Sequence, residues 1–164
     1  MQTEIITTDS QHFINYQSGD IHPSVVLENG DNIYIGENSI IRPGVILDAS
    51  KGPIIIADHV YVDIGALIQG PVYIGPYCTI NPGAKLRKNI SLGPMCKVGG
   101  EMEDVIFQGY GNKQHDGFLG HSFVGSWVNL GAGTTTSNLK NNYSNVSIKW
   151  NGEIIDLSLI HIRL

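Results

Sequence analysis

The chain has few charged side chains, and those it has are not clustered. Only 15% of its 164 residues are charged, with 10 Lys and Arg against 15 Asp and Glu, so the formal net charge is −5. It carries no basic stripe of the kind that nucleic-acid-binding proteins use. It also lacks a long apolar run and a charged-then-apolar leader. We therefore expect a cytoplasmic protein with no membrane span, no signal peptide, and no nucleic-acid or membrane partner.

Cysteine is scarce and glycine is abundant. The two cysteines, Cys78 and Cys96, are too few for a disulfide framework, whereas the chain has 20 glycines. Few charges together with many glycines are typical of a regular, turn-rich β architecture rather than a helical one.

An aliphatic residue recurs at every sixth position over a long central stretch. The series is Ile56, Val62, Ile68, Ile74, Ile80, Leu86, Leu92 and Val98. The position four residues after each is small or apolar, and Gly, Asn, Asp and Pro fill the places between. The same pattern begins near Ile35, and the stretch from Leu47 to Ile55 interrupts it like a short looped-out insertion.

This period predicts an all-β fold, a single-stranded left-handed parallel β-helix of hexapeptide repeats. Three hexads make one triangular coil of about 18 residues, and stacked coils bury the aliphatic residues between them. Cys78 and Cys96 are one coil apart at the same inward position. They are expected to be free, buried thiols.

The period loosens after Val98. The segment from Glu101 to Gln114 is expected to form a protruding loop or a distorted coil, and the pattern returns at Leu119, Val124 and Leu130 with one hexad shortened to five residues. We divide the chain into a lead-in and irregular first coil (1–32), the β-helix (33–133), and a polar loop with C-terminal strands (134–164). Asn151-Gly152 between two alternating runs predicts a hairpin there.

The residues that suggest chemistry lie where the repeat is irregular. Two stretches, Asn112 to His121 and Trp127 to Asn138, place His, Lys, Asp and Asn beside glycine-rich turns. Loops on a rigid scaffold commonly carry function, so a candidate site is centred on His115. The Gly131 and Gly133 amides and the threonines 134–136 are further candidates for binding an anion.

These residues carry a family resemblance. The sequence reads His115-x-x-Phe118-Leu119-Gly120, then a five-residue hexad, then Asn129-Leu130-Gly131-Ala132-Gly133-Thr134 and Ser137-Asn138. It resembles the hexapeptide-repeat acetyltransferase domain of the bacterial bifunctional N-acetylglucosamine-1-phosphate uridyltransferase / glucosamine-1-phosphate acetyltransferase family, which reads H-x-x-Y-L-G, V-N-I-G-A-G-T and T-x-x-N. An alternative branch of that family has a signature similar to Gln108–His121, and the similarity covers residues 33–145.

The resemblance implies an acyl-CoA-dependent N-acetyltransferase that acts on an amino-sugar phosphate in UDP-N-acetylglucosamine biosynthesis. Acetyl-CoA is then a co-substrate, with no tightly bound cofactor, and the expected assembly is a homotrimer with active sites between subunits. By the resemblance His115 falls on the catalytic base, a task that suits histidine. Asn129 and Asn138 fall on sugar-phosphate contacts, and Ala132 and Gly133 are assigned to the acetyl-CoA contact.

Other assignments come from charge and from differences with the family. Lys113 is expected to bind the phosphate because of its charge. The family's arginine before Pro-Gly is Asn81 here, so Arg87 or Arg42 is expected to substitute for it, and the family's tyrosine is Phe118. The family continues for several more coils and also carries a nucleotidyltransferase half. Because Leu157–Leu164 reads as a coil interrupted mid-stack, we expect a fragment of such a protein.

Two alternatives keep the fold and change the function. One is a non-catalytic β-helix that serves as an oligomerisation or regulatory module of a sugar nucleotidyltransferase. The other is a zinc enzyme like the gamma carbonic anhydrases, with His115 and His121 six residues apart and His59 as a third ligand. The motif from Asn129 to Asn138 favours the transferase, whose prediction includes no metal.

Overall fold

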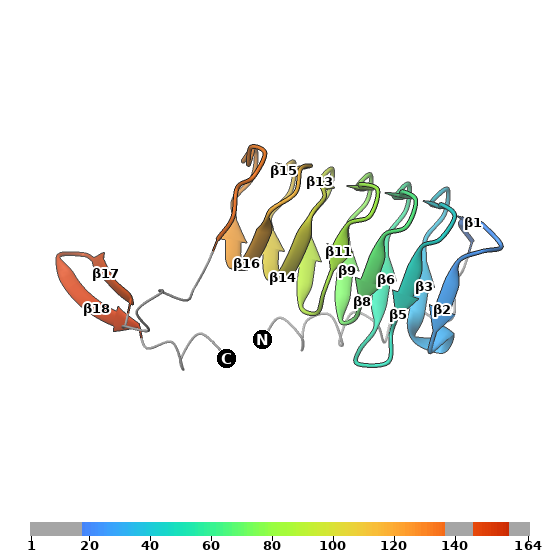
Figure 1. The fold of residues 1–164 in the computed structure, drawn as a ribbon, viewed down its shortest axis with the longest axis horizontal. Helices are drawn as coiled ribbons and strands as arrows, with labels where there is room; N and C mark the ends of the chain where they lie inside the picture. Colours follow the sequence, from blue (N-terminus) through green and yellow to red (C-terminus); the bar gives the residue numbers. More distant parts are fainter. Residues whose placement is uncertain (1–17, 137–145, 158–164) are drawn as a thin grey trace.

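The structure, a computed structural model, describes residues 18–136 and 146–157. Residues 18–136 wind into a left-handed parallel β-helix whose coils stack along one axis (Figure 1). Each coil crosses three faces, which we name A, B and C. The one helical turn within the described residues is η1 (Gly30–Asn32). The predicted fold class is therefore confirmed.

The strands of each face are short and pair in parallel with the coils above and below. Face C is the six-stranded sheet of β1 (Asp20–Ile21), β4 (Ile40–Ile41), β7 (Tyr61–Val62), β10 (Thr79–Ile80), β13 (Lys97–Val98) and β15 (Asn112–Lys113). Face A contains β2 (Val26–Glu28), β5 (Ile46–Asp48), β8 (Leu67–Gln69) and β11 (Lys85–Leu86). Face B contains β3 (Ile33–Ile35), β6 (Ile54–Ile56), β9 (Val72–Ile74) and β12 (Ile90–Leu92).

Two longer strands join faces A and B. These are β14 (Glu101–Phe107) and β16 (Phe118–Val124), and they make the two faces one ten-stranded sheet. The first residues of β14 pair with β11 on face A, and its last residues pair with β12 on face B. The first coil, expected to be irregular, already contributes β1 and β2 to the sheets. The proposed division of the chain at residues 32 and 133 stays a prediction.

The core is the set of stacked inward side chains, as the hexad period predicts. All eight aliphatic residues from Ile56 to Val98 in the series are buried, with at most 1% of their surface exposed. On face C, Val62 pairs with Ile80 and Ile80 pairs with Val98, so the inward residues form a continuous column. The outward neighbours in the same strands are more exposed. Burial of this column through stacking neighbours is what holds each coil in place.

The corners of the prism need a left-handed backbone. At the corner from face C to face A, called the C–A corner, glycine provides it at Gly44, Gly65 and Gly83. At the corner from face B to face C, the B–C corner, residues with side chains adopt it. There His59 stacks on Tyr77 with ring centroids 4.7 Å apart, and Tyr110 stacks on Trp127 at 4.6 Å.

The interruption after Leu47 is confirmed as an insertion. Ile33 pairs with Ile54, whereas Ile54 pairs with Val72, so the coil that contains residues 49–53 is three residues longer than the next one. The extra residues form the loop that extends below β5 and β6 in Figure 1. The rest of this coil keeps the register of its neighbours because only one corner is enlarged.

The segment from Glu101 to Gln114 does not form a protruding loop. It is a distorted coil, whose strand β14 runs across two faces without interruption. The distortion is a shortening, since only Gly99 and Gly100 lie between β13 and β14 at the C–A corner. The inward residues after Val98 are Met102, Phe107 and Lys113. Leu119 and Val124 then return to the core as predicted.

The two cysteines are free and buried, as expected. Cys78 Sγ donates a hydrogen bond to Gly93 O at 3.2 Å, and the Cys96 amide donates to Cys78 Sγ at 3.3 Å. The hydrogen bond with the Cys96 side chain and burial together raise the pKa of Cys78 above its usual range. A thiol in this state is a poor nucleophile, because the thiolate is the reactive form.

We expect neither Cys78 nor Cys96 to react with an aromatic disulfide reagent while the protein is folded. Both are expected to react within minutes in guanidinium chloride, because unfolding exposes both buried thiols to the reagent. Absorbance of the released thiolate measures both rates in one experiment. Rapid modification of the folded protein would show that the core around Cys78 and Cys96 is open.

A β-hairpin follows near the end of the chain. Strands β17 (Val146–Trp150) and β18 (Glu153–Leu157) pair antiparallel around Asn151-Gly152, and both turn residues have positive φ. This confirms the hairpin predicted from Asn-Gly. Residues 137–145 and 158–164 lie outside the described residues, and so do most of the polar loop and most of the segment expected to be an interrupted coil. Among the described residues, no helix has both the length and the apolar character needed to span a bilayer.

Candidate active site

His115 lies in the loop between β15 and β16, at the C–A corner of the sixth coil. Its side chain and that of Asp116 are exposed to solvent. The loop turns onto face A at Gly117, whose φ is +134°, a conformation that disfavours any other residue. A Cβ at Gly117 would also collide with the Thr134 carbonyl. Glycine at this position therefore lets the next coil approach the loop closely.

The stretch 131–136 lies directly against this loop in the next coil. The Gly133 amide donates to Asp116 O at 3.1 Å, and the Thr136 amide donates to Phe118 O at 2.8 Å. Gly131, Ala132 and Gly133 are exposed. The structure therefore brings His115, Asp116, Ala132 and Gly133 to one corner. The Gly133 amide, considered above for an anion, is already used by Asp116 O.

Asn129 lies on face C beside this corner. Its Oδ1 accepts a hydrogen bond from Asn112 Nδ2 at 2.6 Å, and the two backbones form a parallel bridge. Asn112 Oδ1 is buried and has no hydrogen-bond partner in the described chain. Asn112 was not among the predicted site residues, although its spacing of one coil from Asn129 is a signal for such a pair. Asn112 holds the side chain of Asn129 through this hydrogen bond, while its own Oδ1 stays buried.

Lys113 does not face the solvent as its charge suggests. Only 1% of its surface is exposed, and it occupies the inward position that follows Val98 on face C. Its Nζ donates to Gly99 O at 3.2 Å and to His115 O at 2.7 Å. Burial lowers the pKa of Lys113, and the Asp116 carboxylate acts against that shift. In this structure the ammonium holds the backbone at His115, and its contact with a phosphate stays a prediction.

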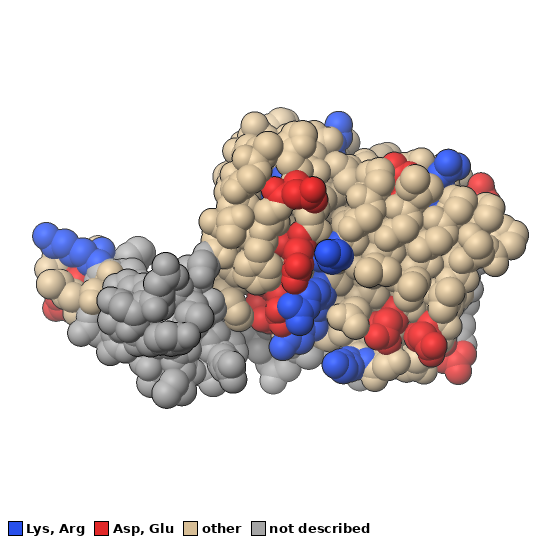
Figure 2. Space-filling view, in the orientation of Figure 1, with Lys and Arg blue, Asp and Glu red and all other residues tan. Residues whose placement is uncertain are grey.

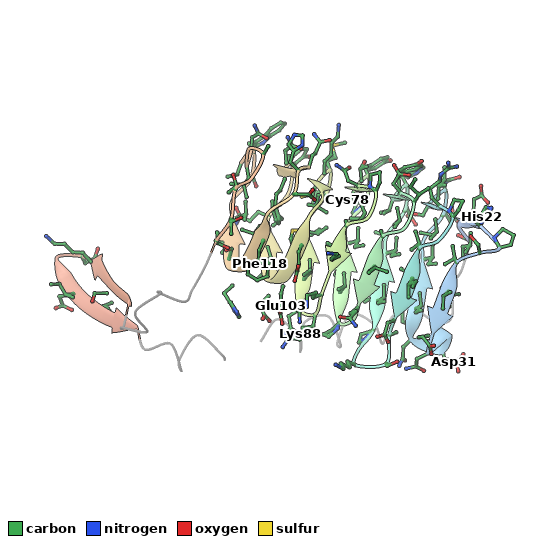
Figure 3. The ribbon with its side chains drawn as sticks, viewed as in Figure 1. His22, Asp31, Cys78, Lys88, Glu103 and Phe118 are labelled. Carbon is green, nitrogen blue, oxygen red and sulfur yellow. The ribbon has the colours of Figure 1, made fainter. Side chains whose placement is uncertain are left out.

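Arg87 is not brought to the His115 corner. It follows β11 at the far end of face A, where its guanidinium pairs with Glu101 at 3.3 Å and Glu103 at 3.1 Å. Lys88 pairs with the same Glu103, and Figure 3 shows these two side chains next to each other. In Figure 2 these charges gather in one band across the middle of the molecule. An arginine already paired with two carboxylates is poorly placed to bind a phosphate.

The structure also shows where Arg42, the other arginine predicted to contact the sugar phosphate, lies, and where Asn81, which replaces the family's arginine, lies. Arg42 is exposed at the C–A corner several coils away from His115. Asn81 donates from Nδ2 to Gln114 O at 3.0 Å, so it contacts the His115 loop directly. Asn138 lies outside the described residues, and its predicted sugar-phosphate contact stays a prediction.

The three histidines of the zinc alternative lie at three different corners. His115 is at the C–A corner, and His59 is at the B–C corner against Tyr77. His121 is at the corner from face A to face B, the A–B corner, where its Nδ1 lies 3.6 Å from Asp104 Oδ2. Residues 18–136 and 146–157 contain no group of three or more His, Cys, Asp or Glu that could hold a metal ion. The three histidines therefore cannot share one zinc ion within a single described chain.

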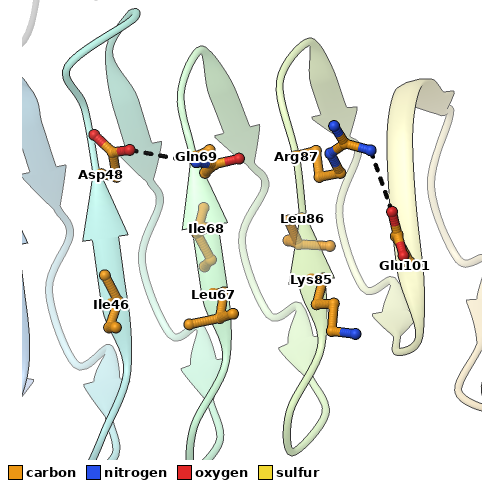
Figure 4. Close-up of a pocket in the computed structure, with 9 residues that line it drawn as sticks. All are labelled: Ile46, Asp48, Leu67, Ile68, Gln69, Lys85, Leu86, Arg87 and Glu101. Carbon is orange, nitrogen blue, oxygen red and sulfur yellow. Dashed lines mark hydrogen bonds and ion pairs between the residues drawn. The ribbon is translucent and has the colours of Figure 1, made fainter.

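A hollow of about 340 Å³ lies on face A (Figure 4), and one of its lining residues, Glu101, pairs with Phe118 at the end of the His115 loop. Its floor is apolar and includes Ile68 and Leu86, and the outward side chains of Ile46 and Leu67 border it. Asp48 and Gln69 line one part, and Lys85, Arg87 and Glu101 line another. The outward column that begins with Val26, Ile46 and Leu67 thus leaves exposed apolar surface on this face.

The comparisons with known proteins concern the scaffold. A search of curated proteins found no match to the chain. Residues 53–88, which run from β6 to β11, match the family described as bacterial transferase hexapeptide (six repeats). The match ends before the His115 loop begins. The coils from β6 to β11 are therefore similar to the hexapeptide repeats of that transferase family.

Proposed function

We propose that this chain is an acyl-CoA-dependent N-acetyltransferase domain that acts on an amino-sugar phosphate of the glucosamine-1-phosphate type. The observation that carries the proposal is the convergence of His115 with residues 131–133 at one corner, joined by the hydrogen bond from Gly133 to Asp116 O. The hexapeptide repeat of bacterial transferases supports the general reaction class. The motif resemblance at Asn129 to Thr134 supports the acceptor.

The proposed reaction is a single acyl transfer. The amine nitrogen of the sugar attacks the thioester carbonyl of acetyl-CoA, and His115 removes a proton from that nitrogen. The tetrahedral intermediate then collapses, the C–S bond breaks, and coenzyme A leaves as its thiol after it gains a proton. An exposed imidazole on a fixed backbone is suited to this step, because a general base must lie within hydrogen-bonding distance of the proton it takes.

The direct test is an acetyl-transfer assay on the purified chain. Glucosamine 1-phosphate and acetyl-CoA are supplied, free thiol is followed by absorbance, and the N-acetylated product is identified by mass spectrometry. Glucosamine without phosphate is the matched control acceptor. Transfer to the phosphorylated sugar alone supports the proposal. If no acceptor is acetylated, the non-catalytic oligomerisation module becomes the better account of this chain.

We also propose that the chain forms a homotrimer through face A. The exposed apolar column that includes Ile46 and Leu67 supports this, since such surface is usually covered in an assembly. The His115 loop borders face A, so a second copy on this face would lie beside the candidate site. Active sites between subunits then follow from the geometry of one interface.

Leu67→Lys is expected to convert the trimer to a monomer, because it places a charge in the apolar part of the proposed interface. Sedimentation equilibrium at several concentrations measures the change in mass. Met95→Lys is the matched control, because Met95 is equally an exposed apolar residue but lies at the B–C corner. A wild-type protein that stays monomeric, or a Leu67→Lys trimer, would contradict the assembly through face A.

A further inference from the structure

The backbone of the His115 loop, defined as residues 113–118, is held at every carbonyl. The donors are the Gly99 amide to Lys113 O (2.7 Å), Asn81 Nδ2 to Gln114 O (3.0 Å), Lys113 Nζ to His115 O (2.7 Å), the Gly133 amide to Asp116 O (3.1 Å), the Glu101 amide to Gly117 O (3.4 Å) and the Thr136 amide to Phe118 O (2.8 Å). Backbone amides supply four of these hydrogen bonds. Side chains supply the two at Gln114 and His115.

The shortened corner beneath the loop explains why side chains are needed there. Only Gly99 and Gly100 lie between β13 and β14, whereas four residues, from Gln114 to Gly117, lie between β15 and β16. The lower corner therefore has too few backbone amides to meet each carbonyl above it. Carbonyls left without donors would make the loop dependent on water and free to move.

Lys113 is an unusual residue for its position. The inward column on face C is otherwise aliphatic at Ile41, Val62, Ile80 and Val98. An aliphatic side chain would fill the same space without the cost of burying an ammonium group. What the ammonium adds is a pair of hydrogen bonds, to Gly99 O below and to His115 O above. Lys113 thus links the shortened corner to the loop that carries the imidazole.

Asn81 completes this arrangement from two coils away. It belongs to the C–A corner between β10 and β11, and its amide passes Gly99 to reach Gln114 O. A Cβ on Gly99 would lie 3.2 Å from Asn81 Cβ and would collide with Gln114 O. Glycine at position 99 therefore keeps open the path between the Asn81 amide and the loop.

We propose that Lys113 and Asn81 are positioning residues that hold the His115 loop, so that the imidazole is aligned with the amine of the acceptor. The alignment of the imidazole for catalysis rests on the proposed acetyl transfer. The restraint of the loop backbone by these two side chains does not. Misplacement of a catalytic group by about 1 Å is enough to reduce a rate about 100-fold. Two hydrogen bonds on adjacent carbonyls limit displacement of that size.

The test compares Lys113→Met and Asn81→Ala with the control Lys97→Met. Met fills the inward position of Lys113 without donating hydrogen bonds, and Asn81 is only partly buried, so its variant is expected to fold. Lys97 is an exposed lysine on the neighbouring strand of the same face. Hydrogen exchange followed by mass spectrometry measures the amides of the His115 loop, thermal unfolding measures the fold, and the acetyl-transfer assay measures kcat and KM.

For Lys113→Met and Asn81→Ala we expect exchange in the His115 loop to be about tenfold faster, while exchange in β7 to β11 is unchanged. We expect kcat to fall about 10-fold to 100-fold in the two variants with a smaller change in KM, and the control to match the wild type. Lys113→Arg is expected to restore part of the protection because it can donate to the same carbonyls.

The exchange result separates this inference from the proposed function. Unchanged exchange of the loop in both variants would overturn the positioning role, even if the wild type transfers acetyl groups. Faster exchange throughout all coils, with a matching fall in the unfolding temperature, would also overturn it, because the two residues would then act only on overall stability. Local loosening in a wild type that transfers no acetyl group would leave the structural role standing and reject the proposed function.

Discussion

His115→Gln is expected to lower kcat for acetyl transfer by about 10²-fold to 10⁴-fold, the usual contribution of a general base. Glutamine keeps polarity and approximate size, but its amide cannot accept a proton at neutral pH. Because His115 is exposed, the substitution removes no core contact. The free energy of unfolding is expected to change by no more than about 0.5 kcal/mol, as is usual for surface positions.

The ratio of kinetic constants makes this prediction specific. A residue that acts only in the chemical step lowers kcat and kcat/KM equally, whereas a residue that only binds substrate raises KM. We expect the first pattern for His115→Gln. Initial rates over a range of glucosamine 1-phosphate concentrations, at saturating acetyl-CoA, measure both constants.

His121→Gln is the matched control for His115→Gln. His121 is also an exposed histidine in the same coil region, but it lies at the A–B corner beside Asp104. Its substitution is expected to change kcat less than about twofold. If His121→Gln has the larger effect, the base is His121 and the site must be moved to the A–B corner. If neither substitution slows transfer, histidine does not act as the base in this chain.

The hexad period predicted the regular coils because every inward position from Ile56 to Val98 lies in one sequence register. The six-residue spacing of inward residues does not continue after Val98, and the reason is physical. The inward residues there are Met102, Phe107 and Lys113, so the spacing changes at two successive corners. A search for one fixed period cannot distinguish such a shortened coil from a loop. In β14 the buried residues are Met102, Val105 and Phe107, so the alternation shifts by one residue at Glu103 and Asp104.

The phosphate contact of Lys113 was predicted from its charge alone, which gave no indication that its side chain is buried. A lysine in a polar segment is normally exposed, and burial of its ammonium is costly without hydrogen-bond partners. Its spacing carried the opposite signal, since it lies six residues after Phe107 and six before Leu119. Of the two carbonyls that make its burial possible, Gly99 O belongs to the coil directly below and His115 O lies two residues further along the chain. Only the structure shows that they meet.

The grouping of site residues was more predictable than their individual roles. Residues one coil apart share a face or a corner, and this rule places Asn129 near Asn112 and Gly133 near Asp116. The rule also separates Arg87 from His115, because the two lie at opposite ends of face A. Side-chain partners such as Asn81 and Gln114 O depend on the shortened corner, so the regular repeat does not predict them.

Ile80→Lys is expected to destabilise the protein by about 3–5 kcal/mol, the usual cost of a buried charge without a partner. For a chain of this length such a loss corresponds to a fall in unfolding temperature of about 6–20 °C. Thr79→Lys is the matched control, because it introduces the same side chain at the adjacent, outward position of β10. It is expected to change stability by no more than about 0.5 kcal/mol.

The lysine introduced at position 80 can be compared directly with the native Lys113. Both positions lie in the inward column of face C, yet only one of them carries a lysine in the native chain. Around Ile80 the corners are regular, and the carbonyls of Ile80 and Val98 already accept backbone hydrogen bonds from Asp63 and Asn81. Around Lys113 the shortened corner presents Gly99 O to the ammonium, and the His115 loop above it presents His115 O. If thermal unfolding shows that Ile80→Lys is tolerated as well as Thr79→Lys, the shortened corner is not what makes a buried lysine possible. A large difference between the two variants would identify the shortened corner as the feature that accommodates Lys113 below the candidate site.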